Sequence, residues 1–475
     1  MVESVTLESR RLLLINPKNS YRKGIYNSSE YSVPPINLGI IAALTPAHWQ
    51  VEILDENFEA FTYREADLVG LTALTSQVNR AYEIAGIYRE RGIKTVLGGI
   101  HASMIPIEAA HYVDTVVEGE GESVWAGLIH DFENNNLKKH YKGELLPMVD
   151  SPFQRLDLYH RGYALGAVQT TRGCPMKCDF CSVHAINGRK YRHRNVADVV
   201  SEFGDIPQNR VYIVDDDFYG YTRKSAERAS EICSKIIAEN VKKEWYTFTS
   251  MHIAEDESTL RLMADAGCRV VLLGIESEIV DQLQASGKKT NLRIGTDNYE
   301  KVFSAFHRNG IAVLGSFIFG LDSDTPESIN RRVDYYINSG VDCIQAGILT
   351  PLPGTGTYYQ LLKENRITHT NYPADWEHYT FFNTVIEPLN MSSAQLRDIM
   401  YEAWEKIYDI KVMKKKYLQT LKRTGNPKAA AWALHANVGY RNTAFEGTKE
   451  MIDFTEIYKS ITGIALDKNL NLKDA

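Results

Sequence analysis

Cysteine is scarce in this 475-residue sequence and confined to its middle. Only six cysteines occur, none of them before Cys174 and none after Cys343. This excludes a disulfide or a cysteine-bound metal centre from the first 173 residues and from the residues after 343. The cysteines that are present include one cluster, because three of the six fall within residues 174–181.

Long apolar runs are also missing. No stretch approaches the roughly 18 apolar residues of a membrane-spanning helix, and the first residues, MVESVTLESRR, lack the apolar core of a signal peptide. We therefore expect a cytoplasmic protein without a membrane span. Thiols stay reduced in that compartment, so the clustered cysteines indicate a metal site rather than a disulfide framework.

Basic residues are fewer than acidic ones: the chain has 53 Lys and Arg and 60 Asp and Glu, which gives a net charge of −7. A nucleic-acid-binding domain usually carries a basic stripe, so we expect no nucleic-acid partner. Hydrophobic residues make up 44% of the chain and charged residues 24%, which is ordinary for a well-cored globular protein. The length allows two or three domains.

The first part of the chain alternates short apolar runs with helical patterns. This alternation predicts a Rossmann-like parallel sheet with helices on both faces, which we place at residues 1–145. Its five strands are expected at 11–17, 51–56, 67–74, 94–100 and 115–121. Ligands of such sheets bind beyond the carboxyl ends of the strands. Those ends read TALTSQ, GGIHAS and EGEGES at 72–77, 98–103 and 118–123. They are either a cradle for a polar cofactor or ordinary turns, which also favour Gly and Ser.

A second alternating series follows a linking segment at 141–164. Its six expected strands, each followed by a helical or loop segment, predict a partial (βα)6 barrel of the TIM type at residues 146–365, with its chemistry at the carboxyl ends of the strands. The strands are expected at 167–174, 210–218, 244–250, 269–277, 312–320 and 343–354. Residues 366–475 read as a mostly α-helical third domain, with helical patterns at 392–423 and 443–461. The fold class is therefore α/β with a helical C-terminal part.

The cysteine cluster has the spacing C-x3-C-x2-C and begins where the first barrel strand ends. Three thiolates suit an iron–sulfur cluster or zinc. Structural zinc needs four protein ligands, and His184 could complete a Cys3His set. A non-catalytic, zinc-stabilised binding protein is therefore one alternative.

This motif, with an aromatic residue before its last cysteine, resembles the signature of the radical S-adenosylmethionine (SAM) enzymes. In that family three cysteines hold three irons of a 4Fe–4S cluster, and SAM chelates the fourth iron. The resemblance implies that Cys174, Cys178 and Cys181 bind one such cluster, with Phe180 beside SAM. A fourth cysteine nearby would block the open iron. The reduced cluster would cleave SAM to give a 5′-deoxyadenosyl radical.

Further family marks lie at the ends of the barrel strands. Arg192 could pair with the SAM carboxylate, because arginine binds carboxylates bidentately; surface exposure is the alternative. Glu276 ends an apolar strand, where an unpaired carboxylate is costly to bury, so we expect a ligand or an Arg partner for it. The resemblance implies that the remaining SAM-binding residues are Asp216, Asp217, Ser250, Ser316, Ile318 and Leu352. For the two aspartates, a solvated acidic turn is the alternative.

The first domain and the barrel together resemble the cobalamin-binding subgroup of radical SAM enzymes. The segments DLVGLTALTSQ, VLGGIHAS and DTVVEGEGES carry this resemblance. The C-terminal part resembles the C-terminal extension of the subgroup that includes hopanoid and bacteriochlorophyll side-chain methylases. The implied cobalamin-binding residues are Thr72, Thr75, Ser76, Gln77, Gly98, Gly99, His101, Glu118, Gly119, Glu120 and Gly121. The D-x-H-x-x-G motif that gives cobalt a histidine ligand in methionine-synthase-type domains is absent, because Gly99 stands where the aspartate would be. We therefore expect His101 to contact the corrin or cap a loop.

The resemblance implies C-methylation of an unactivated carbon. The adenosyl radical would remove a hydrogen atom, and the substrate radical would take a methyl group from methylcobalamin. Radical oxidation, ring closure or rearrangement without methyl transfer stays an alternative. A methylthiotransferase or a peptide-modifying enzyme would need cysteines before Cys174 or after Cys343, where none occur.

Two partners follow from the same reading. One is an external electron donor of the flavodoxin or ferredoxin type. The other is a small-molecule substrate. Aromatic residues at 358–382 form either a packed core or a wall for a large apolar or planar substrate, such as a polycyclic lipid or a tetrapyrrole.

Overall fold

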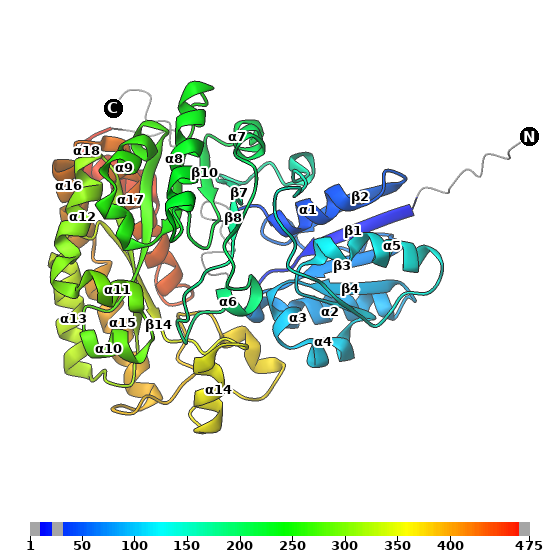
Figure 1. Ribbon diagram of the computed structural model, residues 1–475. Helices are drawn as coiled ribbons and strands as arrows, with labels where there is room; N and C mark the ends of the chain where they lie inside the picture. Colours follow the sequence, from blue (N-terminus) through cyan, green and yellow to red (C-terminus); the bar gives the residue numbers. More distant parts are fainter. Residues whose placement is uncertain (1–9, 21–31, 465–475) are drawn as a thin grey trace, which may run out of the picture.

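The computed structural model describes residues 10–20 and 32–464 and contains two parallel six-stranded sheets. The first sheet and its helices form one lobe, and the second sheet with the C-terminal helices forms the other (Figure 1). A short helix, α6 (Val183–Ile186), lies between the two lobes. The predicted α/β fold class, with its helical C-terminal part, is confirmed.

The first sheet has the strand order β2-β1-β3-β4-β5-β6. Its strands are β1 (Arg10–Asn16), β2 (Trp49–Asp55), β3 (Leu68–Thr72), β4 (Lys94–Gly98), β5 (Thr115–Glu118) and β6 (His140–Lys142). Its helices are α1 (Ile36–Leu44), α2 (Val78–Arg89), α3 (Ile100–Met104), α4 (Pro106–Tyr112) and α5 (Trp125–Glu133). The sequence did not predict β6, a three-residue edge strand with only Tyr141 buried.

Side chains of β1 alternate between two separate cores. Leu12 and Leu14 pack with Trp125 of α5 on one face of the sheet. Leu13 and Ile15 belong to a larger core on the other face, which continues into the barrel lobe. Successive strand residues point to opposite faces, so a strand covered on both sides is apolar throughout.

The second sheet is an open barrel with the order β14-β13-β12-β11-β10-β7, all parallel. Its strands are β7 (Gly166–Val168), β10 (Arg210–Ile213), β11 (Glu244–Thr249), β12 (Cys268–Glu276), β13 (Ala312–Phe319) and β14 (Cys343–Ile348). Its helices are α7 (Val196–Asp205), α8 (Arg223–Ala238), α9 (Glu257–Asp265), α10 (Val280–Ala285), α11 (Lys289–Ile294), α12 (Tyr299–Arg308), α13 (Pro326–Asn338) and α14 (Gly356–Lys363). The expected strand at 167–174 is divided, because its second half leaves the barrel and forms a two-stranded antiparallel ribbon, β8 (Thr171–Arg172) with β9 (Arg192–His193).

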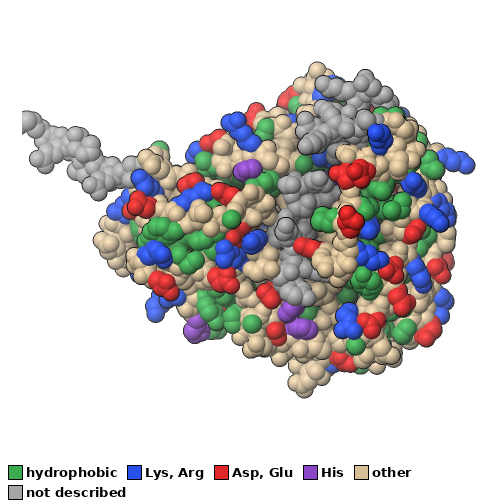
Figure 2. Space-filling view, turned by 180° about the vertical axis from the view of Figure 1, so that it is seen from behind, with side chains coloured by type: hydrophobic (Ala, Val, Ile, Leu, Met, Phe, Trp, Pro, Cys, Tyr) green, Lys and Arg blue, Asp and Glu red, His purple; other side chains and the backbone are tan. Residues whose placement is uncertain are grey.

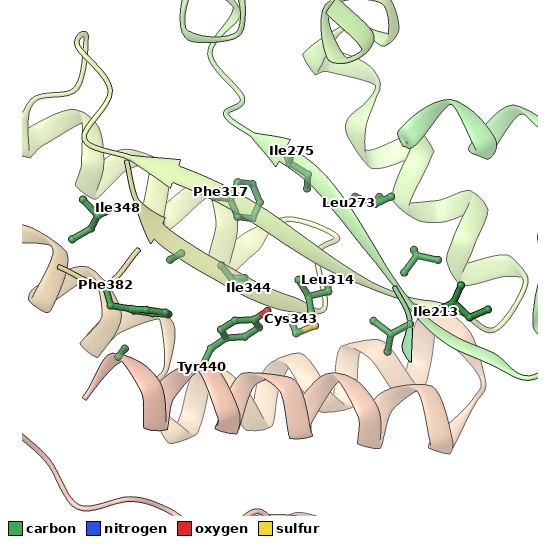
Figure 3. Close-up of a cluster of buried hydrophobic side chains, with 14 of the residues drawn as sticks. Ile213, Leu273, Ile275, Leu314, Phe317, Cys343, Ile344, Ile348, Phe382 and Tyr440 are labelled. Carbon is green, nitrogen blue, oxygen red and sulfur yellow. The ribbon is translucent and has the colours of Figure 1, made fainter. Parts of the chain in front are cut away.

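Up to residue 464, four helices follow the barrel: α15 (Ser393–Ile407), α16 (Ile410–Thr424), α17 (Pro427–Ala444) and α18 (Phe454–Thr462). The helical pattern expected at 392–423 is two helices, because Asp409 caps α16. Helix α17 packs across strands β12–β14, and its Tyr440 points at Leu314 and Cys343 (Figure 3). Thirteen of its 18 residues are buried. None of its residues is exposed, so it lacks the amphipathic stripe by which a surface helix is recognised in a sequence.

The surface carries both signs of charge. On the face shown in Figure 2, Lys and Arg side chains are interspersed with Asp and Glu over the barrel lobe. Within residues 10–20 and 32–464, no helix combines the length and apolar character needed to cross a membrane.

Candidate active site

The first candidate site is a cavity of about 440 Å³ at the carboxyl ends of the barrel strands. Strands β12 to β14 contribute Glu276, Ser316, Ile318 and Gln345 to its wall, and Ser250 reaches it from directly after β11. Cys174, Cys178 and Cys181 line the same cavity. The barrel therefore brings the predicted cysteine ligands and most of the predicted SAM-binding residues to one place.

The cysteines lie in the loop between β8 and β9, residues 173–191, which we call the cysteine loop. Gly173 begins it with φ +94°, and a Cβ atom there would lie 2.3 Å from the carbonyl oxygen of Lys190, so only glycine lets the two ends of the loop approach. All three thiols are free, and Cys178 is buried.

Burial raises the pKa of all three thiols of the cysteine loop, that of Cys181 to about 12. A buried thiolate therefore needs a cationic partner, which iron provides. The residues that the structure describes contain no group of three His, Cys, Asp or Glu side chains arranged around one metal ion. A 4Fe–4S cluster does not require such a group, because each thiolate binds a different iron. The three cysteines on one cavity wall fit such a cluster.

Tyr221 lies beside the first cysteine, although no motif in the sequence indicated it. Its Oη is 3.7 Å from Cys174 Sγ and 2.8 Å from Ser250 Oγ. Ser250 also donates to Asp217. Asp217 is fully buried and does not line the cavity. It supports Ser250 from behind the wall instead of facing the cavity as predicted.

Glu276, for which we expected a ligand or an arginine partner, is paired with a lysine. Lys288 Nζ lies 2.6 Å from Glu276 Oε1 and 5.8 Å from the centre of the Phe180 ring. The pair also faces the cysteines. Although burial opposes it, the charges of Glu276 and Cys178 raise the pKa of Lys288 above its ordinary value, so it remains a cation. No spacing in the sequence pointed to this lysine.

Arg192 lies outside the first cavity. Its guanidinium binds both oxygens of Glu120, from the first sheet, at 2.8 and 2.6 Å. The expected pairing with the SAM carboxylate does not fit this arrangement, because the arginine already has a buried carboxylate partner. Apart from Arg192 and Asp217, the predicted SAM-binding residues, including Asp216 and Leu352, line the cavity.

The second candidate site is a cavity of about 510 Å³ at the carboxyl edge of the first sheet, closed on the other side by the cysteine loop. The predicted cobalamin-binding residues on its wall are Thr72, Gln77, Gly98, Gly99, Glu120 and the two glycines beside Glu120, Gly119 and Gly121. Gly99 has φ +90°, and a Cβ atom there would lie 2.6 Å from Thr72 Oγ1. Glycine at these strand ends leaves backbone groups accessible to a large polar group, which fits a corrin cofactor.

Four of the predicted cobalamin-binding residues do not line this cavity: Thr75, Ser76, His101 and Glu118. His101 is fully buried in α3, its Nε2 lies 3.2 Å from Glu108 Oε1, and its ring packs against Trp376. The expected corrin contact of His101 therefore does not appear, because its imidazole joins the first lobe to the segment that follows the barrel. Glu118 forms surface ion pairs with His140 and Lys142 instead.

The two cavities share part of one wall. Ser182, Val183 and Asp216 line both of them. Asp216 accepts hydrogen bonds from Gly173 N at 2.7 Å and from Asn187 Nδ2 at 2.9 Å, at the two ends of the loop segment that carries the cysteines. Groups bound in the two cavities would therefore face each other across α6.

Comparison with known proteins finds a different family in each of the two lobes. Residues 168–336 match the Radical SAM superfamily, and residues 22–129 match the B12 binding domain. The bacteriochlorophyllide d C-8(2)-methyltransferase of Chlorobaculum tepidum is 31% identical over 74% of this chain and 80% of its own length. The chain belongs to the cobalamin-binding radical SAM methyltransferases. As a member of this family it is an enzyme, and the two matched domains imply a 4Fe–4S cluster, SAM and cobalamin as its cofactors.

Other members of the cobalamin-binding radical SAM group are more distant. The hopanoid C-2 methylase of Rhodopseudomonas palustris is 26% identical over 76% of this chain and 72% of its own length. In fold, the chain resembles the cobalamin-dependent S-adenosylmethionine radical enzyme OxsB, solved with aqua-cobalamin and S-adenosylmethionine bound. The TM-score is 0.67 at 15% identity, covering 95% of this chain and 75% of OxsB. The predicted family is confirmed, and the zinc-stabilised binding protein is not supported.

The aromatic residues at 358–382 are mostly core. Trp376 is buried and stacks on Tyr372 at 3.7 Å between ring centres. Tyr379 and Phe382 are also buried. Of the aromatic residues at 358–382, only Phe381 lines the first cavity.

Proposed function

We propose that this enzyme methylates an unactivated carbon of a small apolar or planar molecule. The observation that carries the proposal is the shared wall of the two cavities, formed by Ser182, Val183 and Asp216. A reaction that uses a radical source and a methyl donor needs both within reach of one substrate carbon. Holding the reactants in the correct geometry supplies much of the rate enhancement in such a reaction.

In the first cavity, Cys174, Cys178 and Cys181 would hold the cluster. When bound, the cluster and SAM supply a 5′-deoxyadenosyl radical, and cobalamin supplies the methyl group. Lys288 and Glu276 present one charge of each sign to the cavity, which suits the carboxylate and amino groups of SAM. The proposed SAM contacts are Phe180, Asp216, Ser250, Glu276, Ser316, Ile318 and Leu352.

In the second cavity, loops after β3, β4 and β5 would hold the corrin. Gln77 binds the carbonyl oxygen of Pro17 and the backbone N–H of Leu74 with its own amide, so its side chain shapes the loop. Leu74 lines the cavity beside it. The proposed contacts are Thr72, Gln77, Gly98, Gly99, Gly119, Glu120 and Gly121.

The proposed substrate class and electron donor follow from the side chains on the cavity wall and on the cysteine loop. Tyr212, Phe248 and Phe381 on the wall of the first cavity suit an apolar or planar molecule. The cysteine loop exposes Lys177, Arg189 and Lys190, which suits an acidic electron carrier of the flavodoxin or ferredoxin type. Six free thiols suit a reducing cytoplasm.

The test is anaerobic reconstitution of the full chain with iron, sulfide and hydroxocobalamin, followed by desalting and absorption spectroscopy. We expect cluster absorption together with stoichiometric corrin bands. Cys178→Ala should lose the cluster and keep the corrin, whereas a bulky residue at Gly98 should lose the corrin and keep the cluster. Retention of a cluster without corrin in the unmodified chain would contradict methyl transfer and favour radical oxidation, ring closure or rearrangement.

A further inference from the structure

Two arginines stand directly opposite each other at the base of the cysteine loop. In the ribbon of β8 and β9, Arg172 pairs in register with Arg192. Arg192 is buried, and the side chain of Arg172 is 12% exposed. Like charges directly opposite in an antiparallel pair repel each other, and low solvent access reduces the screening of that repulsion. The base of the loop is therefore unstable unless an anion binds both guanidinium groups.

The anion comes from the other lobe. Glu120 follows β5 of the first sheet, and its Oε1 lies 2.6 Å from Arg192 Nη2 and 3.2 Å from Arg172 Nη1. Its Oε2 accepts a second hydrogen bond from Arg192 at 2.8 Å. One buried carboxylate thus bridges both strands of the ribbon. Although burial opposes ionisation, the two arginines hold the pKa of Glu120 below its ordinary value.

The remaining donors of the two arginines tie the same point to its surroundings. Arg172 binds Glu122 at 2.7 Å. Arg192 donates to the carbonyl oxygens of Leu146, in the linking segment, and of Asn187, within the cysteine loop itself. Two arginines and two glutamates balance, so the cluster of charges is neutral as a whole. Removal of Glu120 alone leaves an excess buried cation.

We propose that Glu120 is a positioning residue that fastens the base of the cysteine loop to the first sheet. The loop presents its sulfur atoms to one cavity, Asn187 to the other, and Ser182 and Val183 to both. The bridge therefore sets the distance between the two cavities. It also means that the cysteine loop is well ordered only while the 118–122 segment is. The assignment of cofactors to the two cavities rests on the proposed function, but the bridge itself does not.

Hydrogen exchange of the full chain without cofactors tests the bridge, with Glu120→Gln compared with Glu118→Gln. Both substitutions remove one carboxylate from the same segment, but Glu118 pairs only with surface residues. We expect amides of residues 173–191 to exchange about tenfold faster or more in Glu120→Gln and at the original rate in Glu118→Gln. Equal rates in the unmodified chain and Glu120→Gln would overturn the proposal.

A second substitution separates repulsion between the arginines from simple loss of packing. In Glu120→Gln/Arg192→Gln, the excess cation is gone and Arg172 keeps Glu122. We expect exchange in this double variant to be slower than in Glu120→Gln alone. Exchange at least as fast as in Glu120→Gln would mean that Glu120 merely fills the interface, which contradicts the proposal.

Reconstituted protein links the bridge to the cluster. Iron release to a chelator should be several-fold faster in Glu120→Gln than in Glu118→Gln, with partial recovery in the double variant. If the exchange results hold but no variant takes up iron, the bridge stands and the proposed function fails. If iron is retained equally in all variants while exchange differs, the claim that the bridge positions the cluster ligands is wrong.

Discussion

Lys288 and Glu276 form an ion pair, 2.6 Å from Nζ to Oε1, on the wall of the cavity that the three clustered cysteines also line. Glu276 has φ +62°, and the pairing of β12 with β13 shifts register between Gly274 and Glu276. A bulge redirects a side chain, and left-handed backbone at a residue other than glycine persists only where its surroundings hold it. The end of β12 is therefore arranged to aim this carboxylate into the site.

Replacement of Lys288 by Met should weaken SAM binding by at least about tenfold, because it leaves Glu276 buried without its cation. Lys289→Met, at the next position but exposed, is the matched control and should bind SAM normally. Equilibrium dialysis of the reconstituted protein with labelled SAM measures both. Equal affinity in the two variants would exclude a role for Lys288 in the pocket.

Tyr221→Phe should lower the reduction potential of the cluster. The hydroxyl 3.7 Å from Cys174 Sγ can donate to the bound thiolate and stabilise the more negative reduced state. A hydrogen bond worth about 1 kcal/mol corresponds to roughly 40 mV for one electron. A redox titration followed by electron paramagnetic resonance measures the shift.

Tyr219→Phe is the control for that titration, because Tyr219 donates to Asp256 and does not line the cavity. Its potential should equal that of the unmodified enzyme. A potential that is the same in both variants would mean that the Tyr221 hydroxyl does not reach the cluster.

Glu108→Gln should reduce the acid sensitivity of the protein. Burial alone would raise the pKa of Glu108, but hydrogen bonds from His101, Trp376 and Tyr82 hold it below its ordinary value of 4.5. As the pH falls, Glu108 is therefore protonated in the unfolded chain before it is protonated in the folded chain. The stabilisation of the fold by ionised Glu108 is complete above about pH 4.5 and is lost as the pH falls through the folded-state pKa.

Urea denaturation of cofactor-free protein between pH 5.5 and about pH 3.5 measures this effect. The midpoint should fall less steeply with decreasing pH in Glu108→Gln than in the unmodified chain. Glu90→Gln, at an exposed position of the same lobe, should keep the original slope. Identical slopes in all three proteins would contradict the linkage.

Asn437→Ala should destabilise the barrel by about 1–3 kcal/mol, because it leaves buried backbone groups without partners. Asn437 of α17 accepts from Ile344 N at 3.3 Å and donates to Asp342 O at 3.1 Å, at the start of the edge strand β14. Lys422→Ala, exposed on α16, should change the free energy of unfolding by at most about 0.5 kcal/mol. Chemical denaturation compares them, and equal losses would refute the role of Asn437.

Much of the fold was readable from local patterns. Apolar runs separated by helical patterns predicted five strands of the first sheet and all six strand positions of the second, because strands covered on both faces are apolar throughout. The ribbon β8–β9 was missed because its two-residue strands are too short for any periodicity. Helix α17 was missed because none of its residues is exposed, so its sequence lacks the regular polar face of a surface helix.

The sequence by itself determined the chemistry of the cysteine loop. Cys174, Cys178 and Cys181 are close in the chain, so their spacing alone brings three thiols to one loop. The glycines at 98, 99, 119 and 121 likewise act through the local backbone. Because glycine has no Cβ atom, it permits tight turns and close approach wherever it occurs.

Only the tertiary structure decided which side chains face a cavity and which hold the lobes together. Arg192 and Glu120, and likewise His101 and Trp376, are far apart in the chain and meet only because the two lobes pack together. A buried charge takes the nearest partner of opposite sign, since leaving it unpaired costs several kcal/mol. Arg192 therefore binds Glu120 rather than a ligand, and Lys288 became the cation of the first cavity without any signal in the sequence.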